Sequence, residues 1–355
     1  MDVRKTEIEE FPESDRAPGC PHPRETYDLI GHAEAEKRFL AAQSSGRLHH
    51  AWLITGTPGV GKATLAYRMI RHILGGKSLL EDSMNIPQSD PIAQRIASLG
   101  HGNFMLLRRP YDFKLKKLRT EIPVGDVRDV GKFFQGTAAE DDSWRVCLID
   151  SADDLNRNSE NAILKLLEEP PEKALIILLS SSPGRLLPTI RSRCMHLALR
   201  EVDEDEITPW LRSRVDAPDV IIDAAVKLSR GGPGKAIALV QNSEDVLKPL
   251  SAYLKSLDRS NHKIDHTVAN SLSAQTASAS RTLFWEALQD VLQAQSVFSV
   301  TGEWTGAFKP LPVAKSPETW TKLWDKVCEM QRVEAAINMD KKTVMSDTLS
   351  AIRLA

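Results

Sequence analysis

The feature that most constrains the fold is a short apolar segment followed at once by a glycine-rich loop and a helix. Residues 51–55 read Ala-Trp-Leu-Ile-Thr, a run typical of a strand that is buried on both faces. Residues 62–74 have the apolar spacing of a helix. The loop between them consists of Gly56, Thr57, Pro58, Gly59, Val60, Gly61 and Lys62. Strand, glycine-rich turn and helix together open a nucleotide-binding α/β domain.

The rest of the chain predicts three domains. Further strands are expected at 104–107, 145–150 and 174–179, with helices at 33–45, 91–98, 123–135 and 157–168, an alternation that indicates a parallel sheet flanked by helices. After about residue 200 the pattern is helical only. We therefore expect a flexible tail at 1–24, a nucleotide-binding domain at 25–200, a small helical domain at 201–245 and a helical domain at 246–355.

The loop has the chemistry of a phosphate site but departs from the pattern of an active one. Its glycines let backbone N–H groups turn toward phosphate oxygens, and Lys62 adds a positive charge at the start of a helix. Magnesium needs a hydroxyl directly after the lysine, where this chain has Ala63. Thr64 is the nearest hydroxyl, but it lies about 100° around the helix.

A second apolar strand ends in Asp150, about where a phosphate-loop protein carries its metal-associated aspartate. The next residue is Ser151, whereas an active ATPase usually has a glutamate there to polarise the attacking water. The competing interpretation is that Asp150 only caps the following turn. We expect ATP or ADP to bind weakly or without hydrolysis, and we expect no resident metal.

Two further segments resemble the clamp-loader branch of AAA+ proteins: residues 161–171, Asn-Ala-Ile-Leu-Lys-Leu-Leu-Glu-Glu-Pro-Pro, and residues 187–194, Leu-Pro-Thr-Ile-Arg-Ser-Arg-Cys. The resemblance is clear over about residues 28–240. It implies a RecA-like AAA+ parallel sheet domain, a helical lid and an all-α collar domain. It also implies that Arg193 contacts ATP held by a neighbouring subunit, that Ser181 senses the terminal phosphate, and that Lys235 takes the place of a lid arginine.

Within this family the chain resembles the delta-prime type of subunit, a stator that completes a neighbour's ATP site without turning over its own. The implied partners are gamma/tau and delta subunits in a hetero-pentameric ring, the sliding clamp, and primed DNA through the complex. Many bacterial members carry a four-cysteine zinc module, but residues 75–130 contain no cysteine, so we expect no zinc. The alternative is an autonomous AAA+ ATPase, a gamma/tau-like motor or another remodeller, and an unrelated phosphate-loop enzyme such as a small kinase is a third hypothesis.

Charge and hydropathy limit the partners and the cellular compartment that we expect for this chain. The net charge is -2, so any DNA contact must be local or shared with partners. The basic run at 114–119 is expected to be a solvated loop face rather than a DNA contact. No apolar run approaches the roughly 20 residues that span a bilayer, and the first residues lack a secretory signal. We expect a cytoplasmic protein with no membrane partner.

Overall fold

The computed structural model describes residues 11–17, 20–136, 143–257, 263–274, 277–311, 316–336 and 340–354. The chain divides into two compact units. The first contains residues 1–17 and 21–201, and the second contains residues 18–20 and 202–355. The main division, after Glu201, lies one residue from the expected end of the nucleotide-binding domain.

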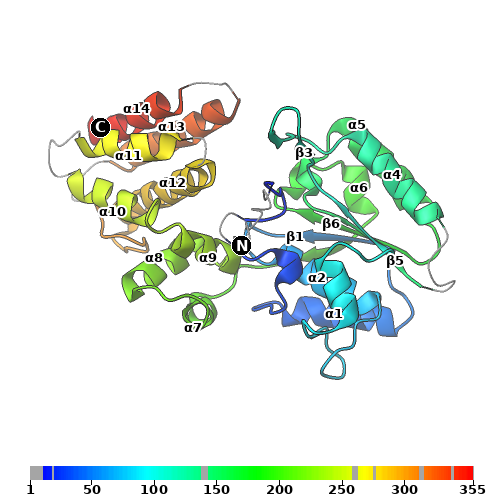
Figure 1. Ribbon diagram of the computed structural model, residues 1–355. Helices are drawn as coiled ribbons and strands as arrows, with labels where there is room; N and C mark the ends of the chain where they lie inside the picture. The colour runs from blue at the N-terminus through cyan, green and yellow to red at the C-terminus, as the bar shows by residue number, and fades with distance from the viewer. Residues whose placement is uncertain are drawn as a thin grey trace, which may run out of the picture. The chain divides into compact units, whose positions relative to one another are not determined.

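A five-stranded sheet forms the centre of the first unit (Figure 1). Its strands are β1 (Ala51–Thr55), β2 (Phe104–Leu107), β5 (Arg145–Ile149), β6 (Ala174–Ser180) and β7 (Met195–Ala198). They run in the order β2-β5-β6-β1-β7, and every neighbouring pair is parallel. All carboxyl ends therefore lie at one end of the sheet, here called its C-terminal end. The four predicted strands are confirmed, and β7 was not predicted.

Helices cover both faces of this sheet, as Figure 1 shows. One face packs against α1 (Ala33–Ser44), α2 (Lys62–Ile73) and α3 (Pro91–Ala97), and the other against α4 (Val124–Gln135), α5 (Arg157–Glu168) and α6 (Pro188–Ser192). Along β1 the side chains alternate, so Trp52 and Ile54 belong to the first core while Leu53 belongs to the second. The parallel α/β sheet that the AAA+ resemblance implies is thus confirmed.

The remaining elements of the first unit are short. They are three 3-10 turns, η1 (Pro23–Glu25), η2 (Ala152–Asp154) and η3 (Pro183–Arg185), and the antiparallel pair β3 (Tyr111–Asp112) and β4 (Lys117–Leu118). Side-chain caps fix where two of the helices begin. Asp90 accepts hydrogen bonds from the first amides of α3, and Asn156 does the same for α5.

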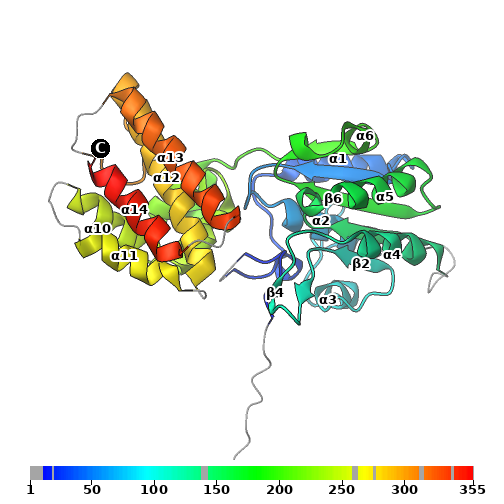
Figure 2. The same ribbon diagram turned by 90° about the horizontal axis from the view of Figure 1, so that it is seen from above.

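The second unit is helical throughout its described residues. Its helices are α7 (Glu204–Arg212), α8 (Asp219–Ser229), α9 (Pro233–Gln241), α10 (Leu247–Ser256), α11 (Lys263–Ser273), α12 (Ser278–Thr301), α13 (Pro317–Ala336) and α14 (Lys341–Leu354). Helix α12 packs along α13, and α11 along α14 (Figures 1 and 2). The expected all-α C-terminal region is confirmed. Among the described residues, every helix falls short of the length and apolarity that crossing a bilayer requires.

The segment before residue 25 differs from the flexible tail that we expected. Within its described part, residues 11–17 and 20–24, Asp15 and Cys20 are buried and the side chain of His22 is only 1% exposed. Residues 1–10, 18 and 19 lie outside the described residues. Ion pairs with residues far along the chain hold this segment, and such pairs leave no local pattern in a sequence.

Candidate functional site

The loop after β1 turns on three glycines whose φ angles are positive, as the predicted phosphate loop requires. Gly56, Gly59 and Gly61 have φ angles of 152°, 79° and 113°, a region that favours glycine. A Cβ on Gly56 would lie 2.9 Å from the carbonyl oxygen of Leu199, so no larger residue fits there. Behind the loop, Nε2 of His32 donates a hydrogen bond of 2.8 Å to the carbonyl oxygen of the buried Val60.

Lys62 begins α2, and its amine folds back onto the loop. Nζ donates to the carbonyl oxygens of Gly56 and Thr57 at 2.8 and 2.9 Å, and to Oγ of Ser181 at 2.8 Å. Burial lowers the pKa of Lys62 to about 8, although Asp150 and Asp153 oppose this shift. The structure therefore brings together two of the predicted site residues, Lys62 and Ser181.

The two residues that follow Lys62 offer little to a metal ion. Ala63 is half-buried and packs against the core of the first unit. Thr64 lies half-buried in the first turn of α2, and its expected role in nucleotide binding stays a prediction. At the helix start, backbone amides and one amine fit a phosphate, whereas no side-chain oxygen stands directly after the lysine to ligate magnesium.

Asp150 follows β5 at the C-terminal end of the sheet, beside the loop. Its backbone amide donates to the carbonyl oxygen of Leu107 at 2.9 Å. Burial, with a smaller contribution from Asp15 and against the opposing effect of Lys62, raises the pKa of Asp150 to about 7. A carboxyl group with this pKa must give up its proton before it ligates a divalent cation, which makes its apparent metal affinity fall as the pH drops below neutral.

Asp153, which the sequence places out of register with the metal-associated position, organises the end of β6. Oδ1 accepts from Oγ of the buried Ser180 at 2.6 Å, and Oδ2 accepts from the amides of Ser181 and Ser182 at 2.7 and 3.3 Å. The turn η2 brings Asp153 across from β5 to the neighbouring strand. Its position fixes the segment that presents Ser181 to Lys62. The only signal for this role is that β5 and β6 are adjacent, which a sequence does not show.

Arg193 lies at the other end of the sheet. It ends α6, two residues before β7 begins at Met195, and β7 pairs with β1 so that Met195 lies opposite Trp52. The loop follows the last residue of β1, Thr55, so a strand length on the order of 13 Å separates the two sites. Nη2 of Arg193 pairs with Oε1 of Glu168 at 2.8 Å and its side chain is 37% exposed.

Lys235, the residue expected to act from the lid, lies in the second unit on α9. Its amine pairs with Oε2 of Glu286 at 3.1 Å and with Oδ2 of Asp290 at 3.6 Å, both on α12. The structure thus assigns its charge to carboxylates of its own unit, and its role toward nucleotide stays a prediction.

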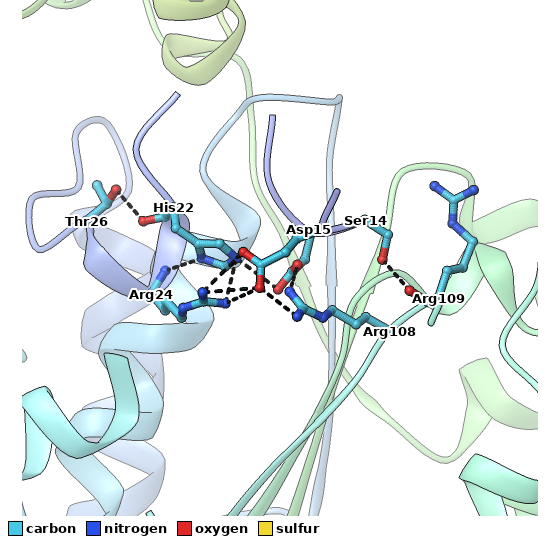
Figure 3. A network of polar contacts seen from close by, with 8 residues as sticks. Ser14, Asp15, His22, Arg24, Thr26, Arg108 and Arg109 are labelled. Atoms are coloured by element: carbon cyan, nitrogen blue, oxygen red, sulfur yellow. Dashed lines mark hydrogen bonds and ion pairs between the residues drawn. The ribbon is translucent and has the colours of Figure 1, made fainter. Parts of the chain in front are cut away.

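An ion network that the sequence did not indicate lies beside the C-terminal end of β2 (Figure 3). Arg108 pairs with Asp15 and, at 2.7 Å, with Glu13, while Arg24 pairs with Glu13 at 3.1 Å. Nε2 of His22 lies 3.2 Å from Asp15. Glu13, Asp15 and His22 have the spacing of metal ligands, but two guanidinium groups already balance both carboxylates. We therefore interpret the cluster as a clasp that holds the N-terminal segment on the first unit.

Comparisons with known proteins fit these findings. Residues 31–203 match the family model described as DNA polymerase III, delta subunit. The chain is 31% identical to subunit delta' of Escherichia coli K12 over 205 residues, 58% of this chain and 58% of that relative. It is 31% identical to subunit delta' of Pseudomonas aeruginosa over 56% and 58%, and to subunit tau of E. coli K12 over 52% and 27%. The match to E. coli delta' thus covers less than two thirds of that relative's length.

Solved structures align as well. A DNA polymerase III gamma subunit-related protein from Thermotoga maritima aligns over 91% of this chain and 99% of its own, with 16% identity and a TM-score of 0.43. A RuvB variant of the same organism aligns over 77% and 79%, with 19% identity and a TM-score of 0.42. Over residues 31–203, about half of its length, the chain is thus similar to the DNA polymerase III delta-subunit family, and the curated relatives that it matches are subunits of that polymerase.

Proposed function

We propose that the chain is a delta-prime-like subunit of the bacterial DNA polymerase III clamp loader. It acts in the cytoplasm within a hetero-pentameric ring of gamma/tau and delta subunits, which loads the sliding clamp onto primed DNA. Its role is that of a stator, which donates Arg193 as a trans arginine finger to the ATP site of a gamma/tau neighbour.

The observation that carries this proposal is the position of Arg193. The side chain lies at the N-terminal end of the sheet, whereas the chain's own phosphate loop lies at the C-terminal end, so Arg193 can serve only a phosphate held by another molecule. Its partner Glu168 is 49% exposed, and an exposed ion pair contributes only about 0–1 kcal/mol. Release therefore costs little, and a fixed guanidinium then offsets charge on the phosphoryl group as it transfers.

The chain's own loop supports the stator role. The backbone amides of residues 56–61 and Lys62 would hold the phosphates of ATP or ADP. To do so, Lys62 must exchange three hydrogen bonds for phosphate contacts, which favours weak binding. With Ala63 and Ser151 at the two positions that serve magnesium and water, hydrolysis at this loop is slow or absent.

The test is ATP turnover by a ring reconstituted from this chain with gamma/tau and delta subunits. Removing an arginine finger costs about 10³-fold or more at the site that it serves, so Arg193→Ala should remove that site's share of turnover while the ring still assembles. Arg193→Lys should recover little, because an amine lacks the planar fork. Arg212→Ala is the matched control, since Arg212 is also a surface arginine, paired with Asp219 at 3.0 Å.

Two results would contradict the proposal. One is unchanged ATP turnover by the ring that carries Arg193→Ala, which would show that Arg193 is not an arginine finger. The other is appreciable magnesium-dependent ATP hydrolysis by the purified chain alone, which would favour the autonomous ATPase. We also expect Lys62→Ala to have little effect on clamp loading, and a severe loading defect would show that the local nucleotide is functional.

A further inference from the structure

Between β2 and α4 the chain forms a small structured hairpin, residues 110–119, here called the basic hairpin. Strands β3 and β4 pair so that Tyr111 lies opposite Leu118. Oδ1 of Asp112 accepts hydrogen bonds from the amides of Lys114 and Leu115 at 3.0 and 3.1 Å, which closes the turn. The run that we expected to be a solvated loop is therefore a folded element with a defined tip.

The base of the hairpin is anchored on both sides. Arg108 joins the ion network of Figure 3, and Nε of Arg109 pairs with Oδ2 of Asp154 at 2.9 Å. Oγ of Ser14 donates to the carbonyl oxygen of Arg109 at 3.1 Å. Because these contacts fix the base, the tip is presented in one orientation and a ligand need not order it.

Aromatic rings gather at the tip and remain open to solvent. Phe113 contacts Tyr111 with ring centroids 5.3 Å apart, and Phe11 lies 5.1 Å from each of them. Phe113 is 69% exposed, and the neighbouring Leu115 is 64% exposed. The ring of Phe113 is thus braced by two others but mostly uncovered, and Phe11, Phe113 and Leu115 together form an exposed apolar patch of the kind that marks interaction sites.

Unpaired cations lie in the same hairpin as the ring of Phe113. Arg119 pairs with Asp112, and Arg108 and Arg109 are occupied at the base. The exposed lysines of the tip, by contrast, make no ion pair with any carboxylate among the residues that the structure describes; they are Lys114, Lys116 and Lys117. In a chain whose net charge is -2, this is a local concentration of positive charge.

We propose that the basic hairpin binds an unpaired nucleic-acid strand, with a base stacked on Phe113 and phosphates contacted by the three lysines. Exposed aromatic faces combined with cations are the chemistry that recognises single strands, because every unstacked base offers a π-face and every nucleotide a phosphate. A duplex hides its base faces and would use only the lysines. This inference adds a contact surface to the proposed function, from which it takes the DNA context, and it does not involve Arg193.

The test is fluorescence anisotropy of labelled (dT)₂₀ with the full chain at salt concentrations from 50 to 200 mM, on the order of the range over which phosphate contacts weaken. Phe113→Ala should weaken binding about tenfold, because one stacked base is lost, and Phe113→Trp should retain it. Phe113→Leu keeps apolar area without the π-face and should behave like alanine. Replacing the three lysines by alanine should reduce the slope of log affinity against log salt by about 2, at roughly 0.7 per phosphate.

Lys132→Ala is the control for charge, since Lys132 is exposed but paired with Asp129 at 2.7 Å. An arm with (rU)₂₀ distinguishes RNA from DNA, and preference for either single strand over a blunt duplex supports the proposal. No binding of single strands at about 50 mM salt would overturn it. The proposal would also be overturned if the duplex bound as tightly as the single strands and Phe113→Ala had no effect. Binding of an acidic peptide in place of nucleic acid would overturn it as well. None of these results alters the expected turnover of the Arg193→Ala ring.

Discussion

Lys62 and Arg193 are both cations of the first unit, but they lie at opposite ends of the sheet and differ in burial and in the groups that they contact. Lys62 is half-buried and donates to three neutral oxygens of its own surroundings. Arg193 lies at the surface, where it pairs with an exposed carboxylate and donates to the carbonyl oxygen of Thr189 at 3.1 Å. The first cation is held by a preformed site, and the second is held by contacts that water can replace.

This difference suggests that the loop around Lys62 serves the stability of the fold, whereas Arg193 is free to act on a phosphate of another molecule. At the C-terminal end, Lys62, Ser181 and Asp153 satisfy one another, so the loop contributes to stability whether or not nucleotide is present. At the N-terminal end, the weak partner of Arg193 leaves the guanidinium available to another molecule. Under the proposed function, a chain without a hydroxyl directly after Lys62 keeps the fold of the loop and completes a site elsewhere.

The largest effect should follow removal of Asp153. Asp153→Ala leaves the buried hydroxyl of Ser180 and the amide of Ser181 without their acceptor and removes one of two acceptors from the amide of Ser182, which should lower the free energy of unfolding by about 2–4 kcal/mol. Urea denaturation measures this loss in the free energy of unfolding. Asp153→Asn keeps one acceptor oxygen and should cost about half as much.

Asp129→Ala is the control for this variant, because Asp129 is exposed and makes one surface ion pair with Lys132. It should change the free energy of unfolding by less than about 0.5 kcal/mol. A loss for Asp153→Ala no larger than this would mean that the C-terminal end of the sheet does not depend on its internal contacts.

A smaller effect should come from the proton on Asp150. Its pKa is about 7 in the folded chain against 3.8 for the ordinary group, so between these values the folded state binds more protons than the unfolded state. Stability from this group is therefore complete below about pH 4 and lost as pH rises through 7. Relative to Asp150→Asn, the free energy of unfolding should fall by about 2 kcal/mol across this range, after halving the full shift for solvent screening.

Denaturation at several pH values checks this prediction. The range ends near neutral pH because Lys62, whose pKa is lowered to about 8, acts with the opposite sign above it: its contribution raises stability as pH climbs toward 10.5. Identical pH profiles for the natural chain and Asp150→Asn would show that Asp150 is ionised and solvated, and would leave it available to a metal ion.

The sequence predicted the parts of this molecule that depend on local pattern. Four continuous apolar runs form β1, β2, β5 and β6. In β1, β5 and β6 nearly every residue is buried, and a strand that is buried on both faces needs apolar residues at successive positions. The edge strand β7 was not predicted, because only Leu197 of its four residues is buried and the segment therefore lacks an apolar run. The basic hairpin was not predicted, because its strands have two residues each.

The sequence predicted which residues belong to the site better than it predicted their contacts. The residues Lys62 and Ser181 were expected from motifs and do meet, since loops after adjacent parallel strands share one end of the sheet. The role of Asp153 and the clasp of Asp15 with Arg108 join residues that are 27 and 93 positions from their partners. No periodicity encodes such pairs, because they depend on strand order and on how the N-terminal segment returns to the sheet.

Adding a hydroxyl after Lys62 should change nucleotide binding modestly. In Ala63→Thr the hydroxyl can ligate magnesium, so magnesium should raise ATP affinity about tenfold, roughly 1.4 kcal/mol, whereas in the natural chain it should change little. Titration calorimetry with and without magnesium measures it. Ala63→Val has the same shape without the oxygen and is the control. Equal magnesium responses of the two variants would show that the missing hydroxyl is not what limits this loop.

The smallest effect should follow removal of the charge that holds Arg193. Glu168→Gln should change the free energy of unfolding by less than about 1 kcal/mol and leave turnover of the reconstituted ring intact, because an exposed ion pair contributes little. Glu160→Gln, on the same helix, is the matched control: Glu160 is buried and Oε1 accepts from the amide of Leu187 at 3.1 Å, so this change should cost more. If Glu168→Gln instead lowered turnover as far as Arg193→Ala, Glu168 would be positioning the guanidinium. The N-terminal end of the sheet would then be as preorganised as the loop, and the contrast between the two cations would not hold.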